Sequence, residues 1–178
     1  MPRYVALFGS INVGGNRLTM ADLRGAFEAE GFTKVETVVA SGNVLFDHEA
    51  RPDRGLEEKL TQMMRQRFAM KSVALVRSRD VLAATIAENP FAADGEEKFV
   101  HTLFLEGPVD PAGFARLMAD HRGAERIAAG DHALHIDYCA GVAESKLVGA
   151  FIERRLGIKG TARNLRSMKR ILAKMDET

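Results

Sequence analysis

The chain has 178 residues, 46% of them hydrophobic, which is enough to build one large core or two small ones. Its 25 Lys and Arg residues nearly balance its 24 Asp and Glu residues, so a formal net charge of +1 excludes a molecule-wide field that attracts nucleic acid or a membrane surface. The single Cys139 excludes an intrachain disulfide, and without a signal-peptide pattern or a run of ~18 apolar residues we expect a cytoplasmic protein with no membrane contact.

The first half of the sequence predicts the element order β-α-β-β-α-β, followed by a short helix. Apolar runs predict the strands, and helical spacing after N-cap residues predicts the helices. The expected strands are residues 4–8, 34–40, 43–48 and 72–78. The first expected helix begins at Thr19 and ends at Gly31, the second begins at Asp53, and the third runs from about Asp80 to Asn89. This order is typical of a ferredoxin-like subdomain, with helices on one face of an antiparallel sheet, and we assign it residues 1–91.

The second half predicts a smaller α+β subdomain over residues 92–178. Its order is β-α-β-β-α plus a final helix. The expected strands are residues 99–105, 124–129 and 132–139, and the expected helices are Pro111–His121, about Glu144–Leu156 with Gly157 as its cap, and one that begins at Thr161. The fold class is therefore α+β in two subdomains, with a basic terminal helix in the second.

A glycine-rich loop, SINVGGN, separates the first strand from the first helix. Backbone amides of such a loop, together with the positive end of the helix dipole, favour an anion. The loop matches neither GxxxxGK[ST] nor GxGxxG, and its glycines also suit a purely structural turn. Both interpretations stay open for its candidate residues Ser10, Asn12, Gly14, Gly15 and Asn16.

A second polar cluster lies at the tight turn between the next two strands, where Ser41, Gly42 and Asn43 follow one another. If the first strand lies beside this hairpin, Asn12 and Asn43 approach each other. Ser and Asn are also ordinary turn residues, so a turn without a ligand is the alternative.

The last 35 residues are basic, with nine Lys and Arg against four Asp and Glu. At helical spacing, Arg163, Arg166, Arg170 and Lys174 fall within one sector of the final helix, opposite its apolar stripe. This face suits phosphate groups of nucleic acid, or it is merely solvated. No aromatic side chain interleaves with the charges, so base stacking is not expected.

The histidines and the cysteine do not predict a metal site or a nucleophile. His132 and His135 are three residues apart on an expected strand and so point to opposite faces. His135, Asp137 and Cys139 share one face, but the strand rise of ~3.3 Å per residue separates His135 from Cys139 too far for an easy hydrogen bond. We therefore expect a buried, inert Cys139.

Taken together, the motifs resemble the family of domains of unknown function numbered DUF1697. The matching segments, in chain order, are GSINVGG at 9–15, SGNVLF at 41–46, NPF at 89–91, SKL at 145–147 and TARNL at 161–165. The chain has Gly9-Ser10 where the family usually has Arg-Gly, and Leu165 where it usually has Trp. The resemblance implies a two-part α+β structure with a ferredoxin-like first half, and it implies no reaction.

Three functions follow as hypotheses. The first is binding of a small anionic or phosphorylated ligand at the glycine-rich loop between the two halves, through Ser10, Asn12, Gly14, Gly15, Asn16, Ser41, Asn43, Lys146, Arg163 and Asn164. The second is nucleic-acid binding through the basic helix face, and the third is a noncatalytic protein-interaction module. The sequence assigns no catalytic group, cofactor or oligomeric state.

Overall fold

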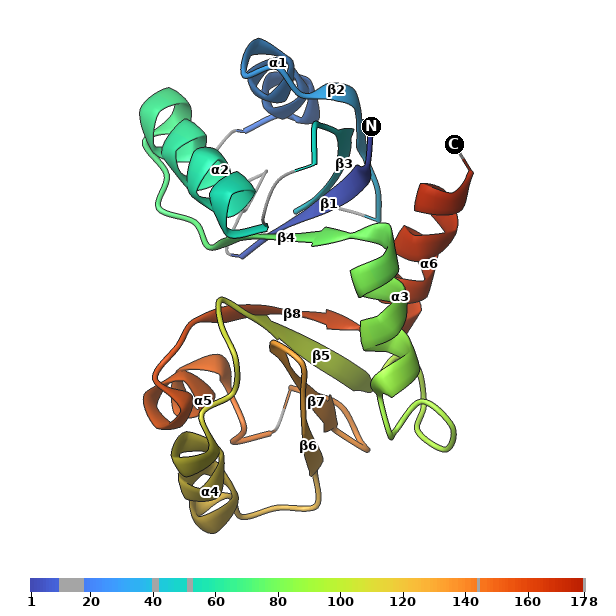
Figure 1. The fold of residues 1–178 in the computed structure, drawn as a ribbon. Coiled ribbons are helices and arrows are strands. Elements are labelled where there is room, and N and C mark those ends of the chain that lie inside the picture. The colour runs from blue at the N-terminus through green and yellow to red at the C-terminus, as the bar shows by residue number, and fades with distance from the viewer. Residues whose placement is uncertain (10–17, 40–41, 51–52, 144, 178) are drawn as a thin grey trace. The chain divides into compact units, whose positions relative to one another are not determined.

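The computed structural model describes residues 1–9, 18–39, 42–50, 53–143 and 145–177. Within these ranges the chain forms two antiparallel four-stranded sheets and six helices (Figure 1). The prediction of an α+β fold in two subdomains is therefore confirmed.

The chain divides into two compact units. Unit 1 contains Met1–Leu82 and Arg170–Thr178, and unit 2 contains Ala83–Lys169. Two helices, α3 (Arg79–Glu88) and α6 (Leu165–Asp176), therefore begin in one unit and end in the other. The domain boundary that the sequence suggests after residue 91 stays a prediction.

Unit 1 contains the predicted β-α-β-β-α-β order. Its elements are β1 (Arg3–Phe8), α1 (Met20–Ala29), β2 (Thr33–Thr37), β3 (Asn43–Asp47), α2 (Asp53–Phe68) and β4 (Ala74–Ser78). The strand order is β2-β3-β1-β4, and every neighbouring pair is antiparallel. Because β3 lies between β1 and β2, this is the split β-α-β arrangement.

Local sequence signals account for the first elements of unit 1. The run from Tyr4 to Phe8 is buried throughout, as expected of a central strand covered on both faces. Thr19 caps α1, since its Oγ1 accepts a hydrogen bond from the amide of Asp22 at 3.0 Å. Gly31 follows the end of α1 with φ +90°, the left-handed conformation that a glycine adopts without strain.

Helices α1 and α2 cover one face of the unit 1 sheet (Figure 1). An aromatic cluster forms the centre of this core: the rings of Phe27, Phe32 and Phe46 lie 4.8–5.7 Å apart. A buried ion pair ties α2 to β4, with Arg77 Nη1 3.1 Å from Glu57 Oε2. The same carboxylate oxygen accepts the amide of Val76 at 2.8 Å.

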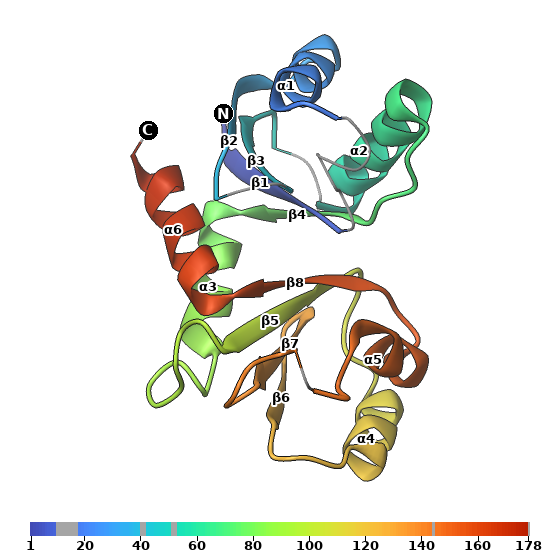
Figure 2. The ribbon, with the colours of Figure 1, turned by 180° about the vertical axis from the view of Figure 1, so that it is seen from behind.

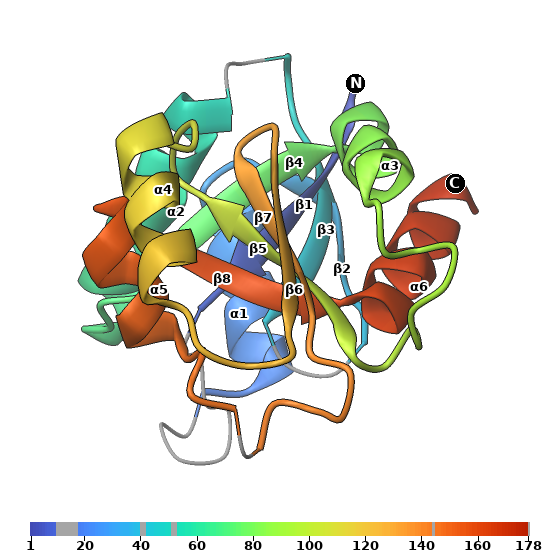
Figure 3. The same cartoon turned by 90° about the horizontal axis from the view of Figure 1, so that it is seen from below.

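Unit 2 repeats the order of unit 1. Its elements are β5 (Val100–Leu105), α4 (Pro111–Asp120), β6 (Arg126–Gly130), β7 (Ala133–Asp137), α5 (Gly149–Leu156) and β8 (Gly160–Asn164). The strand order is β6-β7-β5-β8, again antiparallel (Figure 3). The second half is thus β-α-β-β-α-β, followed by α6.

The prediction of a helix that begins at Thr161 is wrong. Residues 160–164 form β8, in which Thr161 pairs with Phe104 and Arg163 with Thr102 of β5. The helix begins at Leu165 (Figure 2), where the Oδ1 of Asn164 accepts the amide of Ser167 at 2.8 Å. Strand pairing with a distant segment overrides the local helical pattern here.

The predicted start of the preceding helix at Glu144 is also wrong, because α5 begins at Gly149. The segment before it is held by other bonds: Ser145 Oγ accepts the amide of Leu147 at 3.0 Å, and Tyr138 donates its hydroxyl to the carbonyl of Leu147 at 3.0 Å. Leu147 is buried in the core of unit 2. Gly157 ends α5 with φ +76°, as predicted.

Candidate functional site

The ends of three strands of unit 1 lie side by side at one end of its sheet. Leu7 of β1 is paired with Asn43 of β3, and Phe8 is paired with Ala74 of β4. The carboxyl end of β1 therefore lies beside the amino ends of β3 and β4. The strand adjacency on which the expected approach of Asn12 to Asn43 depends is present.

Hydrogen bonds fasten these strand ends to one another. The amide of Phe8 donates to the carbonyl of Gly42 at 2.8 Å, and the amide of Gly9 donates to the carbonyl of Val73 at 2.8 Å. The hydroxyl of Ser72 donates to the carbonyl of Gly9. We call this end of the sheet, formed by Gly9, Gly42 and Val73, the loop end.

Most of the predicted ligand residues continue from the loop end. Ser10, Asn12, Gly14, Gly15, Asn16 and Ser41 lie outside the described residues. They follow Gly9 or precede Gly42 in the chain, so both stretches start or finish at the loop end. Asn43 is the predicted residue that the structure places there, and its side chain is buried.

Val39 has an unusual backbone conformation beside the loop end, with φ +52°. A β-branched residue in this region is a steric outlier that costs about 1–3 kcal/mol. Two bonds hold it: Asn43 donates its Nδ2 to the carbonyl of Val39 at 2.9 Å, and the amide of Val38 donates to the carbonyl of Asn43 at 3.1 Å. Asn43 therefore maintains a strained turn.

Helix α1 begins near the loop end, because it leads from the carboxyl end of β1 back to β2. The first amides of an α-helix lack partners within the helix, and they carry the positive end of its dipole. Thr19 satisfies one of them, and Asp22 places a carboxylate in the same first turn. The amides of Met20 and Ala21 are also among the first amides of α1.

The predicted ligand residues of unit 2 have different surroundings. Lys146 is exposed and precedes α5, whose N-cap residue Val148 makes no side-chain capping bond. Asn164 is the N-cap of α6, so its Oδ1 is occupied by a helix amide. The sequence predicted neither of these environments, because it placed both Lys146 and Asn164 within helices.

The predicted basic face of the final helix is not formed as expected, because Arg163 lies on β8. Its Nη1 donates to Thr161 Oγ1 at 2.9 Å and to the carbonyl of Ala162 at 2.8 Å, and burial lowers the pKa of Arg163 to about 10. Arg166 and Arg170 are exposed on α6. Lys174 is half-buried and forms ion pairs at 3.0 Å and 2.9 Å with two glutamates, Glu36 and Glu177.

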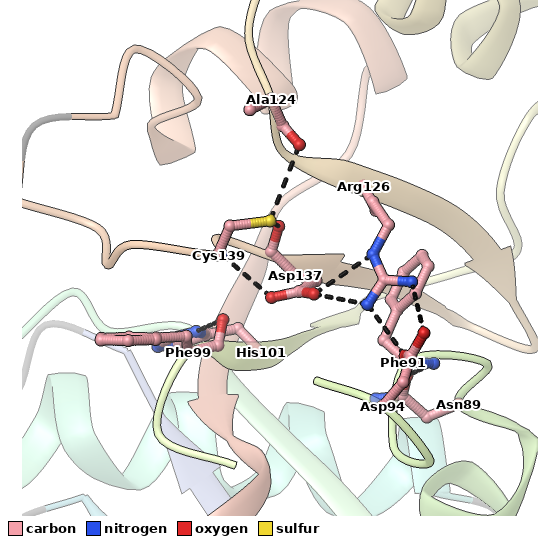
Figure 4. Close-up of polar contacts among 9 residues, drawn as sticks. All are labelled: Asn89, Phe91, Asp94, Phe99, His101, Ala124, Arg126, Asp137 and Cys139. Carbon is pink, nitrogen blue, oxygen red and sulfur yellow. Dashed lines mark hydrogen bonds and ion pairs between the residues drawn. The ribbon is translucent and has the colours of Figure 1, made fainter. Parts of the chain in front are cut away.

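A group of contacts around a single arginine, Arg126, lies on the sheet of unit 2 and was not predicted from the sequence (Figure 4). The guanidinium of Arg126 binds both carboxylate oxygens of Asp94, at 2.9 Å and 3.1 Å, and Oδ2 of Asp137 at 2.6 Å. It also lies 4.7 Å from the ring centroid of Phe91. The hydrogen bond from Arg126 holds the pKa of Asp94 below its ordinary value.

The NPF motif is explained by this packing. Asn89 Oδ1 accepts the amide of Phe91 at 2.9 Å, which fixes the turn after α3 and directs Phe91 under Arg126. Both Asn89 and Phe91 are buried. The motif therefore docks the end of α3 onto the hairpin formed by β6 and β7.

A second link between α3 and this hairpin runs through His135. Its Nε2 lies 2.6 Å from Glu88 Oε2, and its Nδ1 lies 2.9 Å from Thr102 Oγ1. These spacings resemble those of a nucleophile, a base and an orienting acid. However, Thr102 and His135 are both fully buried, so the hydroxyl and the imidazole of this set are inaccessible to a substrate, although Glu88 is exposed.

The triad-like set of His135, Asp137 and Cys139 does not form. His135 bonds to Thr102 and Glu88, while Asp137 Oδ1 accepts the amide of Cys139 at 2.9 Å. The prediction of a buried Cys139 is wrong, because it follows β7 at an exposed turn with φ +59°. Desolvation, and then the charge of Asp137, raise the pKa of the thiol, which disfavours the reactive thiolate.

Metal-binding clusters and membrane-spanning helices are both absent from the part of the chain that the structure describes. No group of three or more His, Cys, Asp or Glu side chains in that part of the chain is arranged to hold a metal ion. No helix among the same residues is long and apolar enough to cross a membrane.

The fold and the loop end define an α+β protein in which one β-α-β-β-α-β order occurs twice. The chain belongs to the family described as "Protein of unknown function (DUF1697)", whose model matches residues 1–135. The matched range includes the SINVGG, SGNVLF and NPF segments, whereas SKL and TARNL lie beyond it.

A solved structure shows the same fold. The conserved bacterial protein SP0830 from Streptococcus pneumoniae is 22% identical to this chain, covers 99% of each chain and has a TM-score of 0.78. At this identity the likeness establishes the fold alone. A search of the curated proteins found no match to the chain.

Proposed function

We propose that this protein binds a small anionic ligand, such as a phosphorylated metabolite, at the loop end of unit 1. The observation that carries the proposal is the strained turn at Val39, which Asn43 holds with a 2.9 Å hydrogen bond. Strained backbone persists where the surroundings over-determine it, and such positions cluster at ligand and active sites. No reaction is assigned, because the hydrogen-bonded set of Thr102, His135 and Glu88 has a buried hydroxyl and a buried imidazole.

We infer the ligand chemistry from the groups that are expected at the loop end. The glycine-rich segment supplies backbone amides, and the N-terminus of α1 supplies the positive end of a helix dipole. The contributing residues in unit 1 are proposed to be Ser10, Asn12, Gly14, Gly15, Asn16, Ser41 and Asn43. Asn43 acts by positioning the turn, because its amide nitrogen is already bonded to Val39.

Three residues of unit 2, Lys146, Arg163 and Asn164, stay predicted ligand residues, and the proposal for the loop end does not depend on them. Lys146 is an exposed cation, and Arg163 is a cation that burial has partly desolvated, which strengthens its interaction with an anion. Asn164 retains its amide nitrogen for a ligand while its oxygen caps α6. We further propose a cytosolic location, consistent with the single exposed thiol of Cys139.

Nucleic-acid binding ranks second. With Arg163 on β8 and Lys174 paired to two carboxylates, the exposed cations of the predicted face are Arg166 and Arg170. Affinity for nucleic acid grows with the number of phosphates that a protein neutralises. Two arginines support a weak and strongly salt-dependent contact.

Thermal stabilisation by a defined anion tests the ligand proposal. Pyrophosphate at increasing concentration should raise the melting temperature, because a ligand that binds only the folded state stabilises it by mass action. The variant Asn12→Ala/Asn16→Ala should lose most of this stabilisation. The control Gln62→Ala, which changes an exposed amide on α2, should keep it.

Sodium chloride at matched ionic strength separates binding from screening. Equal stabilisation of all three proteins, or none by pyrophosphate, phosphate and sulfate alike, contradicts the proposal.

A further inference from the structure

A small cavity that is largely open to solvent lies against the outer face of α5 in unit 2. It has a volume of about 350 Å³ and is lined by Ala150, Glu153, Arg154, Gly157, Ile158 and Lys159. This volume is at the lower end of the range for ligand sites, about 300–1,000 Å³, so it fits a ligand of few heavy atoms. The cavity shares no residue with the loop end.

The charged side chains at the cavity are available to a ligand. Arg154 and Lys159 are exposed and Glu153 is half-buried. None of the three forms an ion pair with any residue that the structure describes, whereas the neighbouring Arg155 binds Asp120 at 3.0 Å. Two cations and one carboxylate therefore face the same small volume.

The remaining lining distinguishes between ligand classes. Ala150 and Ile158 supply apolar surface. The cavity also includes the last turn of α5 and its cap, where the amide of Gly157 donates to the carbonyl of Glu153 at 2.8 Å. The carboxyl end of a helix carries a partial negative charge and favours a cation. A simple anion would be repelled by this partial negative charge and by the carboxylate of Glu153. Its charge therefore matches only the two cations of the lining.

We propose that this cavity binds a free amino acid with an aliphatic side chain. Its carboxylate binds Arg154 and Lys159, its ammonium group binds Glu153 and the carboxyl end of α5, and its side chain packs on Ile158 and Ala150. Each part of the lining then meets a group of the matching charge or polarity. For so small and open a site, the dissociation constant is expected in the millimolar range.

Three probes that share the isobutyl group of leucine test the charges separately. Titration of the ¹⁵N-labelled full chain with leucine should shift the amide resonances of Ala150, Gly157 and Ile158. N-acetylleucine lacks the ammonium group and 3-methylbutylamine lacks the carboxylate, so each should bind at least about tenfold more weakly.

Variants identify the residues that bind each group. Arg154→Ala should weaken leucine binding and leave 3-methylbutylamine unchanged, whereas Glu153→Gln should weaken both amines and leave N-acetylleucine unchanged. Matched controls on α1, Arg24→Ala and Glu28→Gln, should bind leucine as the unmodified protein does.

The absence of shifts at Ala150, Gly157 and Ile158 with leucine at about 50 mM would overturn the proposal. Equal affinity for the three probes, or an Arg154→Ala variant that binds leucine normally, would also overturn it. The pyrophosphate experiment on the loop end uses different residues, so the two proposals succeed or fail independently.

Discussion

Replacing Gly130 with alanine should break the link between Glu88, at the end of α3, and the hairpin formed by β6 and β7. A methyl group built at Gly130 overlaps Glu88 Oε2 and lies 2.7 Å from His135 Nε2. The Glu88 side chain can turn away, but only by giving up its 2.6 Å contact with His135. It would also lose its bonds to the amide of Asp131, at 3.2 Å and 3.3 Å.

The expected cost follows from what remains buried. The side chain of His135 is 1% exposed, so water cannot replace the lost carboxylate at Nε2. A hydrogen bond to a charged group contributes about 1.5–3 kcal/mol, and a buried polar atom left unsatisfied adds its desolvation cost. The Asp131 amide is exposed and adds little. We expect Gly130→Ala to lower the free energy of unfolding by about 2–4 kcal/mol.

Equilibrium unfolding in urea measures this change, and a double-mutant cycle with Glu88→Ala assigns it. Since both substitutions break the same contact, the double variant should lose at least about 1 kcal/mol less than the sum of the two. Gly107→Ala is the control, because a methyl group there meets nothing within 4 Å. Additive effects, or a Gly130→Ala variant as stable as the control, would refute the reasoning.

Four further predictions concern other described residues. Replacing Glu57 with glutamine removes the carboxylate that pairs with Arg77 at 3.1 Å and should cost about 3–5 kcal/mol in urea unfolding; a loss below 1 kcal/mol contradicts a strong buried pair. Asn164→Ala removes the cap of α6 and should cost about 1 kcal/mol, with faster amide exchange in its first turn. Burial raises the pKa of Tyr138 to about 12 while the unfolded phenol titrates near 10, so its contribution to stability is complete below pH 10 and is lost as the pH rises toward 12; Tyr138→Phe should remove that loss. Cys139 should react with iodoacetamide in the folded protein, because it is exposed, but more slowly at pH 7 than in the unfolded chain, because its pKa is raised.

Local signals predicted much of unit 1. The apolar run of β1, the helix start at Thr19 and the turn at Gly31 after that helix are all present. Each depends on residues close together in the chain. The order β-α-β-β-α-β follows from such signals, and the sheet order agrees with it.

Contacts between distant residues explain what the sequence could not predict. Strand β8 exists because Thr161 and Arg163 pair with Phe104 and Thr102 of β5, which lie 57 and 61 residues earlier. Glu88 and His135 are 47 residues apart, and Arg126 and Asp94 are 32 apart, so no spacing rule identifies either pair. His135 and Arg126 therefore form these polar contacts in unit 2 although no local sequence pattern marks either residue. The loop residues Ser10, Asn12, Gly14, Gly15 and Asn16 remain predicted ligand residues.

Titration of the ¹⁵N-labelled protein with pyrophosphate, followed through its amide resonances, tests the proposed function most directly. We expect saturable shifts of the amide resonances at Gly9, at the first turn of α1 and at Val38–Asn43. Chloride at matched concentration should change these resonances little. Shifts confined to Arg166 and Arg170, or no saturable shift at the loop end, would contradict it.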